Sequence, residues 1–244
     1  MKKLKKQLFL LFLILLIPLN SLSCGKSSIS VKVVSDLVFK EQSVLHTVYI
    51  KEGTDYVPFL VLTNDYSGYT LLLRKDVMDE PKRINSYSSY YENSEIDVYL
   101  NNEYLELLET SLSVELVDLV ITTESSLGTT KTNNTTIERR VFLLSCTEIG
   151  VDAPNIAQEG EILKYFTDVS NRLVYSDNET SSWWLRTPNT YYDSCVYSVG
   201  ENNKIGYSNA FDSNGIRPAF CVKGDLPVEL KNGIVENQSV YVFS

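Results

Sequence analysis

Two arginines beside aromatic residues are the side chains of this sequence best suited to hold an anion. Arg186 follows Trp183 and Trp184, the two tryptophans of the chain, in the segment WWLRTP, and Arg217 lies in the segment NGIRPAF. A guanidinium stacks on an indole ring and grips a carboxylate with two hydrogen bonds. Alternate side chains of a strand share a face, so we expect Trp184 and Arg186 to point the same way.

These arginines have a structural and a functional interpretation. As buried ties they would pair with acids such as Glu92, Glu95 or Asp97, because buried charges in proteins are usually paired. As functional groups they would line a pocket for an anionic or sugar ligand. We predict the structural role. The motif residues assigned to it are Trp183, Trp184, Arg186, Gly215, Arg217 and Pro218.

The other residue types that carry chemistry are sparse. His46 is the one histidine, which excludes a Ser-His-Asp triad and a multi-histidine metal site. Cys146 and Cys221 lie in apolar segments and should be buried, whereas a bridge between Cys195 and Cys221 does not follow from spacing. The segment 212–215 offers oxygen ligands but favours a turn over a calcium site. We predict no catalytic residue, no metal and no cofactor.

Tyrosine is abundant, with 16 copies, and gathers in segments rich in serine and asparagine. This combination is typical of adaptable binding surfaces, although strand propensity and compositional bias explain it as well. The candidate ligand-binding residues are Tyr90, Tyr91, Tyr191, Tyr192 and Tyr197.

Most of the chain has the composition of short strands. Runs of branched and aromatic residues with turn residues between them predict strands at 30–39, 44–50, 57–63, 69–74, 139–145, 182–186, 195–199, 204–207, 216–222 and 239–243. The segment 64–68 has the composition of a hairpin loop, and Asn232-Gly233 is expected to lead into the last strand.

Three segments predict helices instead. In SEIDVYLNNEYLELL, apolar residues recur on one helical face at Ile96, Leu100, Tyr104, Leu107 and Leu108. Ser94 and Asp97 have the spacing of a capping box. A second helix is expected near Ser113, with Val114, Val117, Val120 and Ile121 inward, and a short one at 161–166. The threonine-rich segment 122–136 predicts an exposed loop.

The N-terminus predicts export. Four lysines precede an apolar run from Leu8 to Leu19, which is too short to span a bilayer and suits a signal peptide ending at Ser23. Cys24 would then be the first mature residue and a candidate for lipidation, although an ordinary cut with an incidental thiol is an equal alternative. Removal of the signal peptide would take away four lysines, so that the mature chain has 18 basic and 31 acidic residues and a net charge of −13. This negative charge argues against nucleic-acid binding.

The order of four segments resembles an uncharacterised family of bacterial secreted and surface domains. The segments are YENSEIDVYLNNEYL, RRVFLLSCTEIG, WWLRTP and NGIRPAF, and the resemblance covers roughly residues 36–243. A more remote likeness to the formylglycine-generating enzymes implies a C-type-lectin-like fold. Cys195 and Cys221 do not match the paired cysteines of those enzymes, so the resemblance carries over no catalytic residue.

We therefore expect a signal peptide at 1–23, a tether at 24–35 and a single α+β domain at 36–244, with antiparallel sheets and two or three helices. The preferred function is a binding module for a glycan, peptide or protein at the cell envelope or outside the cell, in contact with the membrane only through a lipid at Cys24. The alternatives are an enzyme that uses cysteine redox chemistry and a structural envelope lipoprotein.

Overall fold

The computed structural model describes residues 30–40, 47–108, 111–125, 132–151 and 158–244, and Val31–Ser244 form one compact unit. The predicted signal peptide, Cys24 and His46 lie outside the described residues. No helix in the described part of the chain is long and apolar enough to cross a bilayer.

The core is built on a seven-stranded sheet, in which five strands lie in the order β14-β1-β2-β3-β12, with β13 and β6 at the two edges. All neighbours are antiparallel except β1 and β14, which meet in parallel at Tyr49 and Val242. The strands are β1 (Thr47–Glu52), β2 (Asp55–Tyr66), β3 (Tyr69–Arg74), β6 (Val141–Phe142), β12 (Ala219–Val222), β13 (Val228–Val235) and β14 (Gln238–Phe243).

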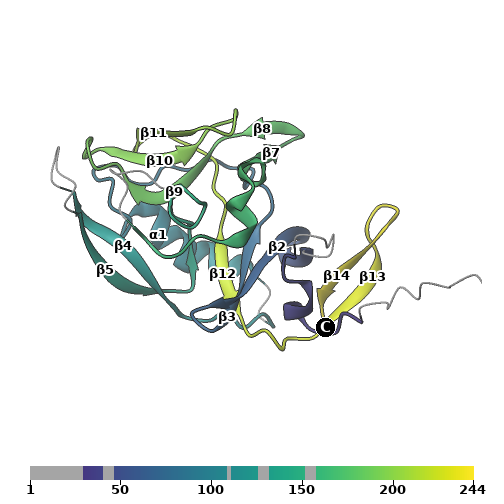
Figure 1. The fold of residues 1–244 in the computed structure, drawn as a ribbon. Coiled ribbons are helices and arrows are strands. Elements are labelled where there is room, and N and C mark those ends of the chain that lie inside the picture. Colours follow the sequence, from purple (N-terminus) through teal and green to yellow (C-terminus); the bar gives the residue numbers. More distant parts are fainter. Residues whose placement is uncertain (1–29, 41–46, 109–110, 126–131, 152–157) are drawn as a thin grey trace, which may run out of the picture. The chain divides into compact units, whose positions relative to one another are not determined.

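Three smaller sheets accompany the main sheet in the described part of the chain (Figure 1). Strand β10 lies between β9 and β11, β4 pairs with β5, and β7 pairs with β8. The bounds are β4 (Val117–Ser125), β5 (Thr132–Arg139), β7 (Val174–Ser176), β8 (Glu179–Ser181), β9 (Trp183–Pro188), β10 (Cys195–Val199) and β11 (Ile205–Asn209). All six residues of β9 are buried, because this strand lies inside the unit.

One helix forms where the apolar period predicts it. It comprises α1 (Glu95–Tyr99), a π-helical turn η2 (Leu100–Tyr104) and α2 (Leu105–Leu107). The Ser94 side chain accepts from the Asp97 amide at 3.2 Å, which confirms the predicted cap, while the Asp97 carboxylate accepts from the Asn93 amide instead of that of Ser94. Leu107 was expected inward and is exposed, because the helix ends there.

The two other predicted helices are not present. Residues 117–125 form strand β4, in which Val117, Leu119 and Ile121 are buried while Asp118 is exposed. Apolar residues at 114, 117 and 121 fit a helical face, but the burial follows the two-residue period of a strand. The segment 161–166 holds only the start of a 3-10 turn, η3 (Lys164–Thr167), which η4 (Val169–Arg172) follows.

Other boundaries differ from the prediction for local reasons. Part of 30–39 is a 3-10 turn, η1 (Val34–Leu37), and the supposed loop at 122–136 is largely strand on both sides of its undescribed centre. Residues 143–145 are buried but lie outside β6, and 232–233 lie within β13, at a bulge. The turn before β14 is at 236–237, where Asn237 has a positive φ.

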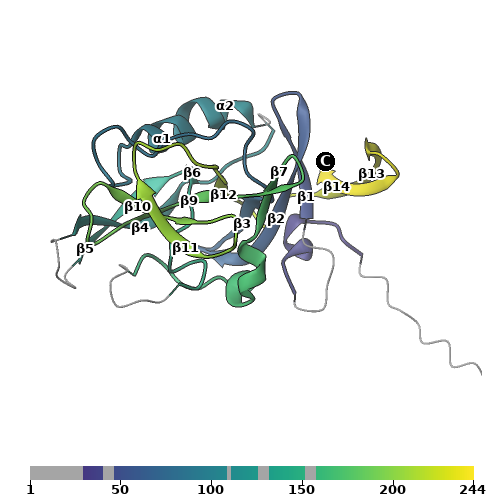
Figure 2. The same ribbon diagram turned by 90° about the horizontal axis from the view of Figure 1, so that it is seen from above.

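In the residues that the structure describes, the unit is thus mostly β, with antiparallel sheets and one short helix where two or three were expected. In Figure 2 the helix lies on one side of the central strands and the turns η3 and η4 lie on the other. The arrangement is not a clear C-type-lectin-like fold. The pair β13 and β14, yellow in Figure 1, lies at one end of the main sheet.

Candidate functional site

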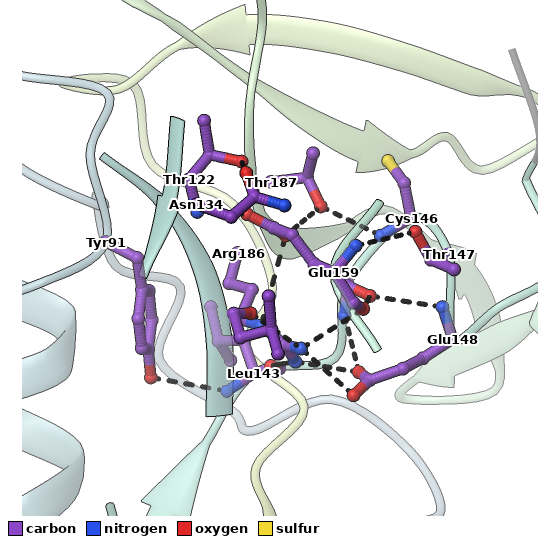
Figure 3. A network of polar contacts seen from close by, with 12 residues as sticks. Tyr91, Thr122, Asn134, Leu143, Cys146, Thr147, Glu148, Glu159, Arg186 and Thr187 are labelled. Atoms are coloured by element: carbon purple, nitrogen blue, oxygen red, sulfur yellow. Dashed lines mark hydrogen bonds and ion pairs between the residues drawn. The ribbon is translucent and has the colours of Figure 1, made fainter. Parts of the chain in front are cut away.

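Arg186 lies at the centre of a buried network of polar side chains (Figure 3). Its Nη1 and Nη2 donate to the two carboxylate oxygens of Glu148 at 2.7 and 3.0 Å, and both side chains are inaccessible to solvent. Although burial opposes the charge, the Glu148 carboxylate raises the pKa of Arg186 above its ordinary value. This two-pronged pair ties Arg186 into the buried interior, and its acid is Glu148 instead of Glu92, Glu95 or Asp97.

A second carboxylate, that of Glu159, closes the network. It accepts from the Thr122 amide at 2.8 Å and from the Thr187 hydroxyl at 2.6 Å. One of its oxygens lies 4.0 Å from Nε of Arg186, which is too far for a hydrogen bond. Burial raises the pKa of Glu159, and this effect exceeds the opposing influence of the Arg186 charge and of the hydrogen bonds from Thr187 and Thr122.

The acids that were expected to pair with the two arginines lie elsewhere. Asp97 accepts from Arg139 at 2.7 Å, and Glu95 accepts from Arg83 at 2.5 Å. Neither acid pairs with Arg186 or Arg217 among the described residues, and the prediction that the helix supplies the pairing acids is wrong. Glu148 follows the VFLLSC segment and sits on a buried turn that carried no helical or strand pattern.

Arg217 is buried without an ion pair among the described residues, contrary to the prediction. Its Nε donates to the backbone oxygen of Arg74 at 2.8 Å, and its Nη1 has no partner. The guanidinium carbon lies 5.0 Å from the ring centroid of Trp183 and 5.9 Å from that of Phe166. Burial lowers its pKa to about 10, so the group remains charged at neutral pH.

The remaining motif residues hold β9 against the chain before β12. A Cβ atom on Gly215 would lie 2.4 Å from the Ser182 oxygen, so this contact requires glycine. Trp184 donates its amide to the Gly215 oxygen at 3.0 Å, and the Pro218 oxygen accepts from the Arg74 amide at 2.9 Å. The two indole N–H groups donate to backbone oxygens of Arg172 and Lys82, and both rings are fully buried.

Cys146, Cys195 and Cys221 are free and buried, and no bridge joins Cys195 to Cys221. Burial raises the pKa of the Cys146 and Cys221 thiols, which keeps them protonated and unreactive. Among the described residues no group of three or more His, Cys, Asp or Glu could hold a metal ion. Segment 212–215 forms a bend followed by two bridge residues.

Three of the five candidate tyrosines come together on the small sheet of β9, β10 and β11. Tyr191 and Tyr192 are about half exposed, at 45% and 52%, and Tyr197 is partly buried. Together with Tyr207, which is 49% exposed, they line an open groove of about 660 Å³. We call it the tyrosine groove, and its other lining residues are Asn189, Ile205 and Gly206.

The groove is held in shape by the β10–β11 hairpin and by the turn before β10. Tyr197 and Tyr207 are direct cross-strand partners, with ring centroids 6.4 Å apart and nearly perpendicular. The Asn189 side-chain oxygen accepts from the amides of Tyr191 and Tyr192 at 2.8 and 3.1 Å. The rings of Tyr192 and Tyr207 lie 5.3 Å apart. An Asx turn and a strand pair thus position the four phenols.

Tyr90 and Tyr91 are not among the residues that line the groove. Tyr91 is fully buried, and its hydroxyl accepts from the Leu143 amide at 3.3 Å, so it is a core residue. Tyr207 was missed by the sequence interpretation. The signal was present, since strands at 195–199 and 204–207 separated by Gly200 and three polar residues imply a hairpin that places Tyr207 opposite Tyr197.

This antiparallel β unit with a buried WWLR strand matches one family model. Residues 67–224, more than half of the chain, match the domain of unknown function DUF6273, and the chain belongs to this family. No curated protein and no solved structure matches the chain.

Proposed function

We propose that the domain is a binding module whose tyrosine groove takes a neutral glycan. The observation that carries this proposal is the composition of the groove, in which three half-exposed tyrosines and one partly buried tyrosine stand with no charged side chain in the lining. Exposed aromatic rings that gather in a groove are otherwise costly to leave in water, so they point to an interaction site.

The chemistry of the groove suits sugar rings. The negative face of an aromatic ring attracts the weakly positive C–H groups on the flat face of a pyranose, and the phenol hydroxyls donate to and accept from sugar hydroxyls. Burial raises the pKa of Tyr197 to about 12, and a hydrogen bond with Tyr192 raises that of Tyr207. Phenols are uncharged at neutral pH in any case, and the raised pKa values move their ionisation still further away, so the groove carries no charge and suits a neutral ligand.

Export, a place in the cell envelope and attachment through Cys24 are part of the same proposal. They rest on the basic and apolar N-terminal segment and on the acidic composition of the rest of the chain. A module of this kind would face polysaccharides outside the membrane. Peptide or protein ligands of the groove are outcomes that the experiment below distinguishes.

The test is binding of the purified domain to neutral soluble polysaccharides, a β-glucan, a mannan and a galactan, by affinity electrophoresis and calorimetry. At least one should bind, and Tyr207→Ala or Tyr192→Ala should weaken it about tenfold, because each ring loses its stacking contact. Tyr175→Ala is the matched control, since Tyr175 is 45% exposed and lies outside the groove.

Failure of all three polysaccharides to bind, or equal losses in Tyr175→Ala and Tyr207→Ala, would remove the support for a glycan. If a protein or peptide retards the domain in affinity electrophoresis and Tyr207→Ala abolishes this effect, the ligand of the groove is a protein or peptide instead of a glycan.

The alternative of a cysteine redox enzyme has no specific support in the described residues. Such an enzyme needs an accessible thiol with a lowered pKa. Cys146 and Cys221 have the opposite property, and Cys195 lies buried in β10. Labelling of the folded protein with a thiol reagent should leave all three unmodified, and rapid modification of Cys195 or Cys221 would revive this alternative.

A further inference from the structure

A second cavity, separate from the tyrosine groove, has a volume of about 620 Å³. Its lining comes from the segment after η1, the end of β2 with its turn, the β4–β5 pair and residues 160–164. We call it the β2–β4 cavity. It shares no lining residue with the tyrosine groove, so a ligand could occupy either one without the other.

One side of the β2–β4 cavity is apolar. The apolar lining residues are Val38, Phe39, Leu62, Val120, Ile162 and Leu163. Leu62 and Leu163 are buried in the core, whereas Ile162 is 55% exposed beside the opening. An exposed isoleucine next to a concave apolar wall provides the surface on which an apolar side chain of a ligand would be buried.

The other lining residues give the cavity a negative charge. Asp65, Asp118 and Glu161 are exposed carboxylates of the lining, and Lys164 is the exposed cation. Arg186 also belongs to the lining, but Glu148 neutralises its charge through two hydrogen bonds. The net charge at the opening therefore attracts a cation and repels an anion.

Arg186 supplies an independent sign of a polar ligand. Its Nε–H is buried and has no hydrogen-bond partner among the described residues. The nearest carboxylate oxygen, from Glu159, lies 4.0 Å away. A buried donor without an acceptor costs free energy, and a carbonyl oxygen of a ligand is one group that would satisfy it.

We propose that the β2–β4 cavity binds a peptide segment in which an apolar side chain stands next to a lysine or arginine. The apolar side chain packs against Leu62, Leu163 and Ile162, and the basic group interacts with Asp118 and Glu161. A peptide backbone oxygen takes the free donor of Arg186. This inference does not rest on the proposed glycan function.

The test is a titration of the isotopically labelled domain with the capped peptide acetyl-Leu-Lys-Leu-amide, followed by nuclear magnetic resonance at low salt. Saturable shifts are expected for the amides around the cavity. The peptide acetyl-Leu-Glu-Leu-amide, acetyl-Ser-Lys-Ser-amide and hexylammonium should all bind more weakly. Added salt should weaken the lysine peptide, because the carboxylates are exposed and screened.

Variants locate the site. The double variant Asp118→Asn/Glu161→Gln should weaken binding of the lysine peptide about fivefold, in line with two exposed charge contacts. Ile162→Ser should weaken it as well. Asp225→Asn/Glu236→Gln is the matched control, since it removes two exposed carboxylates outside the cavity. Tyr207→Ala should leave peptide binding unchanged, which separates this proposal from the glycan proposal.

Three results would overturn the inference. The first is equal affinity for the lysine and glutamate peptides, and the second is an equal loss in the cavity variant and its charge-matched control. The third is hexylammonium binding as tightly as the peptide, which would reduce the site to one for simple amines. The inference is also overturned if the lysine peptide causes no saturable chemical-shift change at all.

Discussion

Arg186 and Arg217 occupy similar sequence contexts, but the charge of Arg186 is paired with a carboxylate and that of Arg217 is not. Arg186 is neutralised by a two-pronged pair with Glu148, whereas Arg217 has one backbone acceptor and two aromatic rings. Removal of one member of a buried ion pair leaves the other charge in the protein interior without a counter-ion and without water to solvate it. A lone buried cation leaves no such charge behind when it is removed, so the two arginines should differ in their effect on stability.

We expect Arg186→Met to lower the free energy of unfolding by about 3–5 kcal/mol, because Glu148 and Glu159 would remain buried without a cation. Arg217→Met should be close to neutral or stabilising, since it removes an unpaired buried charge and keeps an apolar side chain against Trp183. Urea unfolding followed by circular dichroism measures both. A larger loss in Arg217→Met than in Arg186→Met would contradict this account.

Glu159 should make stability depend on pH. Its pKa is raised by burial in the folded state, so the folded protein keeps a proton that the unfolded chain releases. This contribution is fully present below the ordinary carboxyl pKa and is lost as the pH rises through the raised value. The stability of the native sequence relative to Glu159→Gln should therefore fall between about pH 5 and about pH 8.

Urea midpoints at those two pH values provide the measurement. Glu161→Gln is the control, because it removes an exposed carboxyl group close in sequence to the buried one. A constant difference for Glu159→Gln would show that Glu159 titrates as it does in the unfolded chain.

At the scale of elements, the packing of β9 against the chain before β12 decides where the buried arginines lie. A parallel bridge joins Trp183 to Gly215, and the Trp184 amide donates to the Gly215 oxygen. A glycine permits this approach because it has no Cβ atom, which would otherwise lie 2.7 Å from a methyl carbon of Val77 as well as against the Ser182 oxygen.

Gly215→Ala should destabilise the fold by about 1–3 kcal/mol, because overpacking at a buried contact forces the two segments apart. Gly206→Ala is the control within β11, where an added Cβ would meet nothing within 4 Å and the backbone has no positive φ. Thermal unfolding of the two variants should show a clear loss for Gly215→Ala and little change for Gly206→Ala. Equal melting temperatures would mean that the two segments move apart to accommodate the added Cβ atom without a loss of stability.

At the scale of the molecule, the main sheet extends past the part of the chain that the family model covers. The model matches 67–224, but β3 lies between β12 and β2, and β2 with β1 precedes residue 67. The residues of β2 that are fully or almost fully buried are Phe59, Leu60, Val61 and Leu62. The matched segment therefore lacks the strands that continue the main sheet beyond β3, together with the buried apolar side chains that β2 contributes to the core.

A fragment of residues 67–224 should not fold, because it would expose the unpaired edge of β3 and lose the buried apolar side chains of β2. A fragment of residues 31–229 should fold with a lower melting temperature, since most of β13 and a third of β14 are exposed. Soluble yield, circular dichroism and melting temperature test both. A cooperative melt of the 67–224 fragment would contradict the expectation.

Much of the β structure and one helix could be predicted from the sequence, because their signals are local. The strands at 69–74 and 195–199 match the prediction, and the helix cap at Ser94 lies where the hydroxyl and the carboxylate have the right spacing. The helix expected near Ser113 failed because its apolar spacing fits two periods over so short a stretch, and only pairing with β5 selects the strand.

The tyrosine site could be predicted in part for the same reason. Tyr191, Tyr192 and Tyr197 are close in sequence and meet at one hairpin, whereas Tyr91 is drawn into the core by Leu143, 52 residues later. Which acid would neutralise Arg186 was not predictable, because Glu148 is joined to it across 38 residues with no pattern in between.

The sequence by itself determined the types of residue that must be buried, the strands with a clear period and the capped helix. These depend on neighbours a few positions apart, where backbone geometry fixes which side chains meet. The tertiary structure alone decided which charges are paired, which tyrosines reach the surface and where the β2–β4 cavity lies. Each of these depends on contacts between segments far apart in the chain, and no local rule specifies such contacts.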